Sequence, residues 1–391
     1  MKTLGVFGDL RTTVGEAKMN LNAAPLRSQV KRRTALFPTF QSGLVRGALA
    51  LAAVSSCTGA ALADEGGVSF WLPGLFGSLA AAPQQPGWSA AAIYYHTTVS
   101  AGGDVALQRE FEIKNIPVGL TATAHANASL NATGDLGLFI PSYVFATPVF
   151  GGQAAVSLMT VTGNASTSLN GTVTGTLTPP GIPFMRSDSI SDSTTGFGDL
   201  YPMFALRWNA GVNNFMTYVT GDIPVGAYNS SNLANIGIGH GAIDAGAGYT
   251  YFNPQMGHEF SAVGGFTYNL TNQATDYQNG VDFHLDMAAS QFLSKQFFVG
   301  AVGYIYDQVS ADRGSAPILG PIESRVAGIG PQAGYIFPVG GMQGVVNLKA
   351  YFEFDSHDRP DGWNTWVTFS ISPPAPPAPS PPASRTAMIN K

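Results

Sequence analysis

Three ionisable side chains recur at every second position of one segment, namely Asp282, His284 and Asp286. Alternate side chains of an extended strand point to the same face, so these three would lie in a row. Carboxylate and imidazole groups in such a row suit several divalent metal ions. The same row would also serve as a hydrated inner wall that faces positive charge on neighbouring strands. We favour the wall, and we expect neither a bound metal ion nor a cofactor.

Other charged and aromatic side chains fall on the corresponding face of neighbouring segments. Rings of charge can orient a permeating solute, or they can fill a narrow interior with salt bridges, and the sequence leaves both open. The surplus of acidic groups would disfavour small anions, and the tyrosines could stack against an aromatic ring. The expected inward-facing set is Arg207, Asp244, Glu259, Asp282, His284, Asp286, Tyr304, Tyr306, Lys349, Tyr351 and Glu353.

Sequence motifs of common catalytic sites are missing from the chain. It contains no G-x-S-x-G, no H-E-x-x-H and no Gly-rich phosphate loop between a strand and a helix. Each of the six histidines offers a base, but none has a persuasive nucleophile near it in sequence. We therefore expect that the protein is not an enzyme.

The elements that carry these side chains have a period of two. In 281–290 the odd positions are apolar, from Val281 to Ala289, whereas the even ones hold the ionisable row. Segments of about ten residues with this alternation are typical of transmembrane β-barrels, and strands in lipid must close into a ring. The same alternation appears in 242–252, 259–269, 296–308 and 343–354.

Turn residues separate these segments, and the count of candidate strands is about 12, with 14 as the upper bound. Expected turns are Asn253-Pro254, Asn279-Gly280, Ser294-Lys295, Gly340-Gly341 and Asp361-Gly362. The stretches 127–135 and 163–176 are rich in Asn, Ser, Thr and Gly, and would be strand ends, hairpin turns or lumen-facing strands. The aromatic last strand, 363–371, resembles the signal by which the barrel assembly machinery recognises its clients.

Composition favours a lipid-facing protein. Charged residues make up 11% of the 391 residues, against roughly 25% in typical soluble proteins, and there are 47 glycines. A secreted β-solenoid or a surface-layer protein would share this composition, and a soluble antiparallel sheet would share the alternation. Apolar faces rich in Phe, Leu, Val and Tyr on many strands, with no helices to cover them, favour lipid. No apolar run after Ala63 reaches the roughly 20 residues of a spanning helix.

The first 63 residues resemble an export signal. They carry eight Lys/Arg and two acidic residues, then a short apolar run and the sequence Ala61-Leu62-Ala63, after which we expect cleavage. A lipoprotein box ending at Cys57 and a twin-arginine signal at Arg32-Arg33 are alternatives. Residues 64–373 carry nine Lys/Arg and 22 Asp/Glu, which argues against nucleic acid as a partner. Removal of Cys57, the single cysteine, would leave no thiol.

The expected organisation has four parts. These are an N-terminal extension and signal peptide (1–63), a plug or tether (64–87), a closed antiparallel barrel in the outer membrane (88–372) and a Pro-rich disordered tail (373–391). Trp71, Leu75 and Phe76 have little reason to lie in water, so we favour a plug inside the barrel over a periplasmic tether.

Several stretches resemble the outer-membrane protein family associated with the meta-cleavage pathway of phenol degradation. They are 71–88, 194–228, 232–254, 264–286, 303–314 and 328–338, in the same order along the chain. The resemblance implies an all-β barrel that passes small hydrophobic or aromatic solutes across the outer membrane. The alternative is a structural or surface-exposed barrel without transport.

Overall fold

The computed structural model describes residues 69–102, 109–113, 121–178, 181–314 and 323–374. The chain divides into two compact units, Met1–Ala52 and Ala53–Lys391, and every described residue belongs to the second. The expected signal peptide, its cleavage after Ala63 and most of the Pro-rich tail lie outside the described residues. In the described part, no helix has the length and apolar character needed to cross a membrane.

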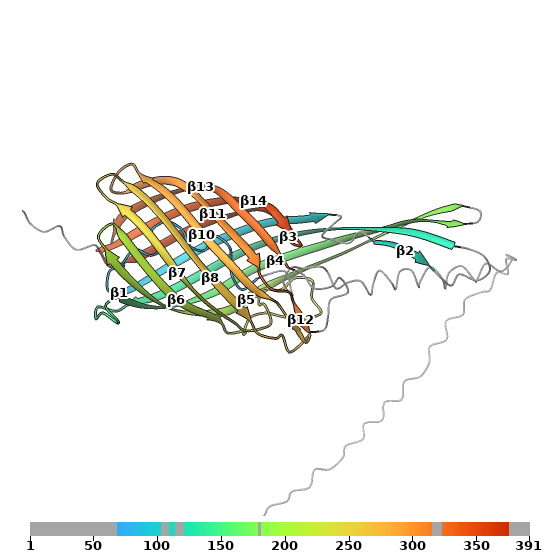
Figure 1. Ribbon diagram of the computed structural model, residues 1–391, viewed down its shortest axis with the longest axis horizontal. Coiled ribbons are helices and arrows are strands. Elements are labelled where there is room, and N and C mark those ends of the chain that lie inside the picture. Colours follow the sequence, from blue (N-terminus) through green and yellow to red (C-terminus); the bar gives the residue numbers. More distant parts are fainter. Residues whose placement is uncertain (1–68, 103–108, 114–120, 179–180, 315–322, 375–391) are drawn as a thin grey trace, which may run out of the picture. The chain divides into compact units, whose positions relative to one another are not determined.

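Twelve antiparallel strands of the described chain form a closed ring (Figure 1). The order around the ring is β1-β15-β14-β13-β11-β10-β8-β7-β6-β5-β4-β3, and β3 pairs back onto β1. The ring strands are β1 (Gly87–Gly102), β3 (Thr121–Val144), β4 (Gln153–Thr178), β5 (Ile182–Ala210), β6 (Asn213–Asp222), β7 (Ala242–Asn253), β8 (His258–Asn269), β10 (Val281–Phe292), β11 (Phe297–Gln308), β13 (Arg325–Val339), β14 (Met342–His357) and β15 (Asp361–Ser372).

Ring closure depends on β1, which is paired along both of its edges. One edge pairs with β15 from Ala90↔Ile371 to Ser100↔Asp361, and the other with β3 from Gly87↔Val144 onward. This double pairing satisfies the backbone groups that an open sheet would expose to lipid. The sequence prediction of a closed antiparallel barrel of about 12 strands is confirmed.

The two ends of the ring differ in their connections. At one end, here called the turn end, short turns join the strands, such as Gly340-Gly341 with positive φ at both residues. At the opposite end, the loop end, longer connections carry the short strands β2 (Arg109–Ile113), β9 (Tyr277–Gln278) and β12 (Arg313–Gly314). Three of the expected turns lie between strands and Asn253-Pro254 begins at the last residue of β7, but Asp361 and Gly362 begin β15 instead.

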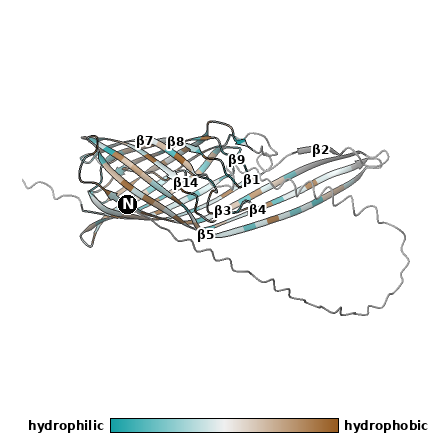
Figure 2. Ribbon diagram, turned by 90° about the horizontal axis from the view of Figure 1, so that it is seen from below, coloured by the Kyte–Doolittle hydropathy of each residue, from teal (hydrophilic) through white to brown (hydrophobic). Residues whose placement is uncertain are grey.

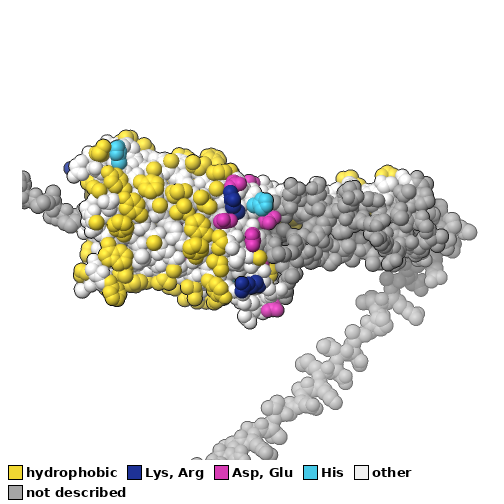
Figure 3. All heavy atoms as spheres, viewed as in Figure 1, with side chains coloured by type: hydrophobic (Ala, Val, Ile, Leu, Met, Phe, Trp, Pro, Cys, Tyr) yellow, Lys and Arg dark blue, Asp and Glu magenta, His cyan; other side chains and the backbone are white. Residues whose placement is uncertain are grey.

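Side chains alternate between the outside and the inside of the ring. Outward-facing Phe266, Leu348 and Phe352 are exposed, whereas His284 and its neighbours on β10 are buried inside. Hydrophobic side chains cover the barrel wall in Figure 3, and the charged side chains visible there gather beside the loop end. Hydrophobic and hydrophilic positions interleave along the barrel strands in Figure 2. This inside-out pattern is what lipid around a polar interior requires.

Three ring strands continue beyond the loop end. β3, β4 and β5 have 24, 26 and 29 residues, and β4 pairs with β5 as far as Leu177↔Ile182. Only Met203–Ala210 of β5 pairs with β6, so the outer parts form a narrower sheet. The stretches 127–135 and 163–176 lie within β3 and β4, and thus belong to long strands, not to turns.

Candidate functional site

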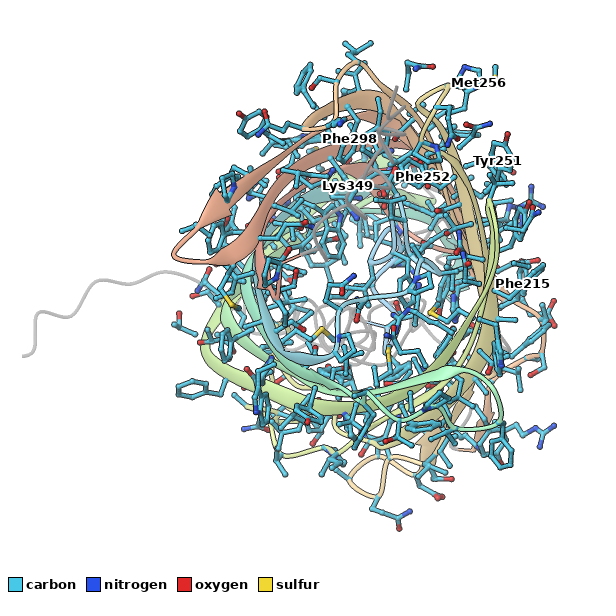
Figure 4. The ribbon with its side chains drawn as sticks, turned by 90° about the vertical axis from the view of Figure 1, so that its left-hand side faces the viewer. Phe215, Tyr251, Phe252, Met256, Phe298 and Lys349 are labelled. Atoms are coloured by element: carbon cyan, nitrogen blue, oxygen red, sulfur yellow. The ribbon has the colours of Figure 1, made fainter. Side chains whose placement is uncertain are left out.

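The segment 69–86, here called the lumen segment, runs inside the ring before β1 begins. Asp286 of β10 accepts hydrogen bonds from the backbone N–H of Gly74 (2.8 Å) and of Phe76 (3.0 Å). Lys349 of β14 points into the ring in Figure 4 and donates from Nζ to the carbonyl oxygen of Gly74 at 2.5 Å. An anion and a cation on the wall therefore hold one turn of the lumen segment, since this turn has no ladder partner of its own.

A second set of contacts lies closer to the turn end. Glu259 of β8 accepts from Ser78 Oγ (2.8 Å) and from the N–H of Leu79 (2.9 Å). Gln332 of β13 donates from Nε2 to Ser78 Oγ at 2.8 Å, and Ser290 Oγ lies 2.7 Å from the same oxygen. These polar wall side chains satisfy backbone and hydroxyl groups of the lumen segment.

The contacts continue to the turn end of the lumen. Thr250 Oγ1 accepts from the N–H of Ala81 at 3.0 Å, and Arg207 Nε lies 3.4 Å from the carbonyl oxygen of Ala80. Gln153 and Gln84 exchange two hydrogen bonds between side chain and backbone, of 2.6 and 2.8 Å. The lumen segment is thus attached to the wall along its whole described length.

Trp71 is the apolar anchor of the lumen segment. Its indole stacks on the ring of His284, with 3.6 Å between ring centroids and 14° between planes. His284 Nε2 lies 2.9 Å from Asp244 Oδ2, and both side chains are buried. Phe76 packs against Trp71 with ring centroids 5.8 Å apart. Stacking and the buried pair together place the start of the segment over β7 and β10.

A cavity of about 130 Å³ lies between the lumen segment and the loop end. Its floor is formed by Ser69, Leu72 and Pro73 of the lumen segment. Its walls come mostly from β1, β3 and β4 and from the β6–β7 connection, and they are largely apolar or weakly polar. The wall residues include Tyr95, Thr97, Val99, Leu130, Ala132, Leu136, Ala165, Thr167, Ala234, Asn235 and Ile236.

One corner of the cavity is polar. Glu353 of β14 accepts from Tyr304 Oη at 2.6 Å and from the N–H of Gly362 at 2.9 Å. Asn364 donates from Nδ2 to Tyr304 Oη at 2.9 Å. Arg359 also lines the cavity, and its guanidinium carbon lies 4.6 Å from the ring centroid of Tyr306. The cavity therefore offers an apolar space with charged and hydrogen-bonding groups at one side.

The β6–β7 connection folds inward against this cavity. Asp199 of β5 accepts from the N–H of Gly226 (2.6 Å) and of Ile238 (2.8 Å), which ties both ends of the connection to the wall. Asp192 accepts from the N–H of Leu233 at 2.9 Å. Ile236 and Ile238 are consequently buried although they lie in an irregular segment.

The expected inward-facing residues lie inside the ring, but they do not form one site. Arg207, Glu259, Asp286 and Lys349 contact the lumen segment, and Asp244 pairs with His284 under Trp71. Tyr304 and Glu353 line the cavity, whereas Tyr351 packs on Tyr304 with 4.9 Å between centroids. Asp282 accepts from Asn269 Nδ2 at 2.8 Å. Trp71 is buried, and Leu75 and Phe76 pack against the core. A role of any of them in a solute path remains a prediction.

The row Asp282, His284 and Asp286 does not converge on one point, because each side chain has its own partner. Within the described ranges, no three His, Cys, Asp or Glu side chains are grouped so that they could hold a metal ion.

Much of the cavity wall was not predicted from the sequence. Leu130, Ala132 and Leu136 lie on one face of β3, in or beside the stretch 127–135, for which a lumen-facing strand was one of three alternatives and no individual residue was predicted to face the lumen. The available signal was the series Leu130, Ala132, Gly134 and Leu136, which places Leu, Ala or Gly at every second position. Asn364 and the inward fold of 234–236 depend on distant contacts and had no comparable signal.

Among solved structures, the chain is similar to the COG4313 outer membrane channel from Pseudomonas putida F1. The TM-score is 0.53 at 11% identity, and the match covers 74% of this chain and 97% of that chain. A FadL homologue from Pseudomonas aeruginosa matches with a TM-score of 0.32 at 11% identity, over 77% and 94% of the two chains. The first similarity supports the barrel fold, while the second is too distant to support more.

A comparison with curated proteins gave no match. A family model described as "Putative MetA-pathway of phenol degradation" matches residues 117–369, which is well over half of the chain. The match contains the stretches between 194 and 338 that carry the resemblance, whereas 71–88 lies before it. The chain belongs to this family of the MetA pathway of phenol degradation.

Proposed function

We propose that the protein is an outer-membrane channel for the passage of small hydrophobic or aromatic compounds. The observation that carries the proposal is the largely apolar cavity of about 130 Å³ inside a closed, lipid-facing barrel. An apolar cavity of about 150 Å³ is known to hold one benzene molecule, so this space suits a single ring. Membership of a family linked to phenol degradation supports the same class of solute.

Passage would not use a wide aqueous pore. A 12-stranded ring leaves little open lumen once side chains are counted, and the lumen segment forms the floor of the cavity. A solute in the cavity would therefore leave either by displacing the lumen segment or through the barrel wall. Export through the inner membrane, with cleavage after Ala63, and insertion by the barrel assembly machinery belong to the same proposal.

A structural barrel without transport is the second candidate. The hydrogen bonds that hold the lumen segment from Gly74 to Gln84 favour it, because they would suit a permanently filled interior. The two candidates differ in whether the cavity matters for uptake.

A substitution that fills the cavity distinguishes the channel from the structural barrel. Ala132→Trp on β3 would occupy much of the space, whereas Ala301→Trp, exposed on the lipid face of β11, makes the same change outside. For a channel, we expect uptake of radiolabelled toluene or phenol by Ala132→Trp cells to fall to that of cells without the protein. Ala301→Trp should resemble the wild type. Equal uptake by wild-type and protein-free cells would support the structural barrel.

A further inference from the structure

A carboxylate is held in one orientation at the edge of the cavity. Both oxygens of Glu353 accept hydrogen bonds, Oε1 from the Tyr304 hydroxyl and Oε2 from the N–H of Gly362. An ionised carboxylate is acceptor-only and has roughly four lone-pair sites, so it retains acceptor capacity toward the cavity. Glu353 thus presents a positioned acceptor to any molecule in this space.

The orientation is reinforced by buried side chains behind it. Trp366 Nε1 donates to Asn364 Oδ1 at 3.0 Å, and Asn364 Nδ2 in turn donates to the Tyr304 oxygen at 2.9 Å. Tyr304, Asn364 and Trp366 are all buried. Because the Tyr304 oxygen accepts from Asn364, its proton points to Glu353. This series of hydrogen bonds ends at the Glu353 carboxylate. Its remaining lone pairs therefore point away from Tyr304.

The other charged group of the cavity is Arg359. The flat face of a guanidinium can stack on an aromatic ring, and that of Arg359 lies against the ring of Tyr306. Glu353 is oriented from two sides by hydrogen bonds. It is therefore a positioned recognition group, and a carboxylate would repel an anionic solute that came to the same corner.

We infer that Glu353 determines specificity by accepting a hydrogen bond from a hydroxyl or amino group on the ring of a neutral aromatic solute. The inference deepens the proposed function and rests on it. Unsubstituted hydrocarbons would enter the same cavity without this contact, and aromatic carboxylates would be rejected. Tyr304 is a positioning residue, because it contacts Glu353 and holds the carboxylate in place.

Binding of four single-ring probes to the purified full-length protein tests the inference. Phenol and aniline carry a donor, toluene carries none and benzoate is an anion. Affinities are measured by calorimetry in detergent, with the cavity-filled Ala132→Trp protein as the blank for partition into micelles. We expect wild-type protein to bind phenol and aniline about tenfold more tightly than toluene, since hydrogen bonds to charged groups contribute most strongly. Benzoate should bind most weakly.

Glu353→Gln should lower the affinity for phenol about tenfold. The affinity for toluene should not change, and the affinity for benzoate should rise. Glu323→Gln makes the same change at an exposed loop position and should behave as wild type. Tyr304→Phe keeps the Glu353 carboxylate but removes the hydrogen bond that orients it. The affinity for phenol should fall severalfold, and the affinity for toluene should not change. Tyr304→Phe therefore tests the inference even if Glu353→Gln fails to fold.

Three outcomes would overturn the inference. A wild-type protein that binds benzoate as tightly as phenol would point to Arg359 instead. A phenol-to-toluene ratio that stays the same in Glu353→Gln would remove Glu353 from recognition while leaving the channel intact. A wild-type protein that binds none of the four probes would reject both the inference and the proposed function.

Discussion

At the scale of the residue, charged side chains inside the ring contact the backbone of the lumen segment. Asp286, Lys349 and Glu259 hydrogen-bond to backbone groups of the lumen segment, and a solute does not need to be present for them to be paired. A buried backbone without ladder partners must find donors and acceptors on side chains. The charge ladder expected from the sequence is thereby divided between holding this segment and lining the cavity.

Lys349→Met should loosen the lumen segment. The variant removes a charged donor whose hydrogen bond contributes about 1.5–3 kcal/mol, so amides of residues 74–76 should exchange with solvent about tenfold faster or more. Hydrogen exchange with mass spectrometry measures this, and bilayer conductance should rise in parallel. Lys295→Met, in an exposed turn, is the matched control. Unaltered exchange in Lys349→Met would show that the amine does not hold the segment.

Asp244→Ala should lower the stability of the barrel much more than a comparable change at an exposed pair. The variant leaves His284 buried without its carboxylate, a change that costs about 3–5 kcal/mol in buried pairs. The exposed pair His96–Asp135, with 2.8 Å between Nδ1 and Oδ1, gives the control Asp135→Ala, for which about 0–1 kcal/mol is expected. Denaturant unfolding in detergent compares the two. Equal losses of unfolding free energy in Asp244→Ala and Asp135→Ala would show that burial does not make the Asp244–His284 pair more important for stability.

At the scale of the element, the lumen segment can approach the wall only because of glycine. Gly74 has φ of +88°, and a Cβ built there would lie 2.9 Å from the Tyr351 ring. Three residues later, a Cβ at Gly77 would meet only the flexible side chain of Lys349, with Cδ at 3.5 Å and Nζ at 3.6 Å, both ordinary contacts. Two glycines of one short segment thus face very different constraints.

Gly74→Ala should displace the segment, whereas Gly77→Ala should leave it in place. The first substitution combines a left-handed backbone with a clash against a buried ring, and the second has neither. Limited proteolysis of folded protein, followed by mass spectrometry, should find cleavage within 69–86 only in Gly74→Ala. Equal resistance of both variants would show that the segment does not need its close approach to Tyr351.

At the scale of the whole molecule, the ring and the outer sheet differ in how their strands are paired. The ring is closed on every edge by twelve strands, while the outer parts of β3, β4 and β5 extend beyond it. Barrel stability should therefore depend on ring pairs and much less on the outer hairpin.

Replacement of residues 171–188 by an Asn-Gly turn should leave a folded barrel. These residues pair only with one another and with the outer part of β3. The outer-membrane fraction, run on a gel with and without heating, should show the same mobility shift as wild type. Removal of an equal share of the β7–β8 hairpin from the ring should abolish the shift. A soluble, unshifted product from the outer deletion would show that the hairpin is needed for assembly.

The sequence by itself determined the strand period, the faces and the closed ring. The period of two in 281–290 separates apolar from ionisable side chains, and strand geometry converts this local pattern directly into two faces. Lipid requires closure, so the barrel follows from the same pattern. The inward positions of Asp244, Glu259 and Lys349 could be predicted for this reason.

Only the tertiary structure decided what those side chains contact. Gly74 and Asp286 are 212 positions apart, and Lys349 reaches the same turn from β14. The cavity combines β1, β3 and β4 with the lumen segment, and its apolar wall at Leu130 and Ala132 alternates with Asn131 and Thr133 on the other face of β3. Contacts of this kind depend on which distant strands face one another across the ring and on the lumen segment within it, and neither is encoded in the alternation of a single strand.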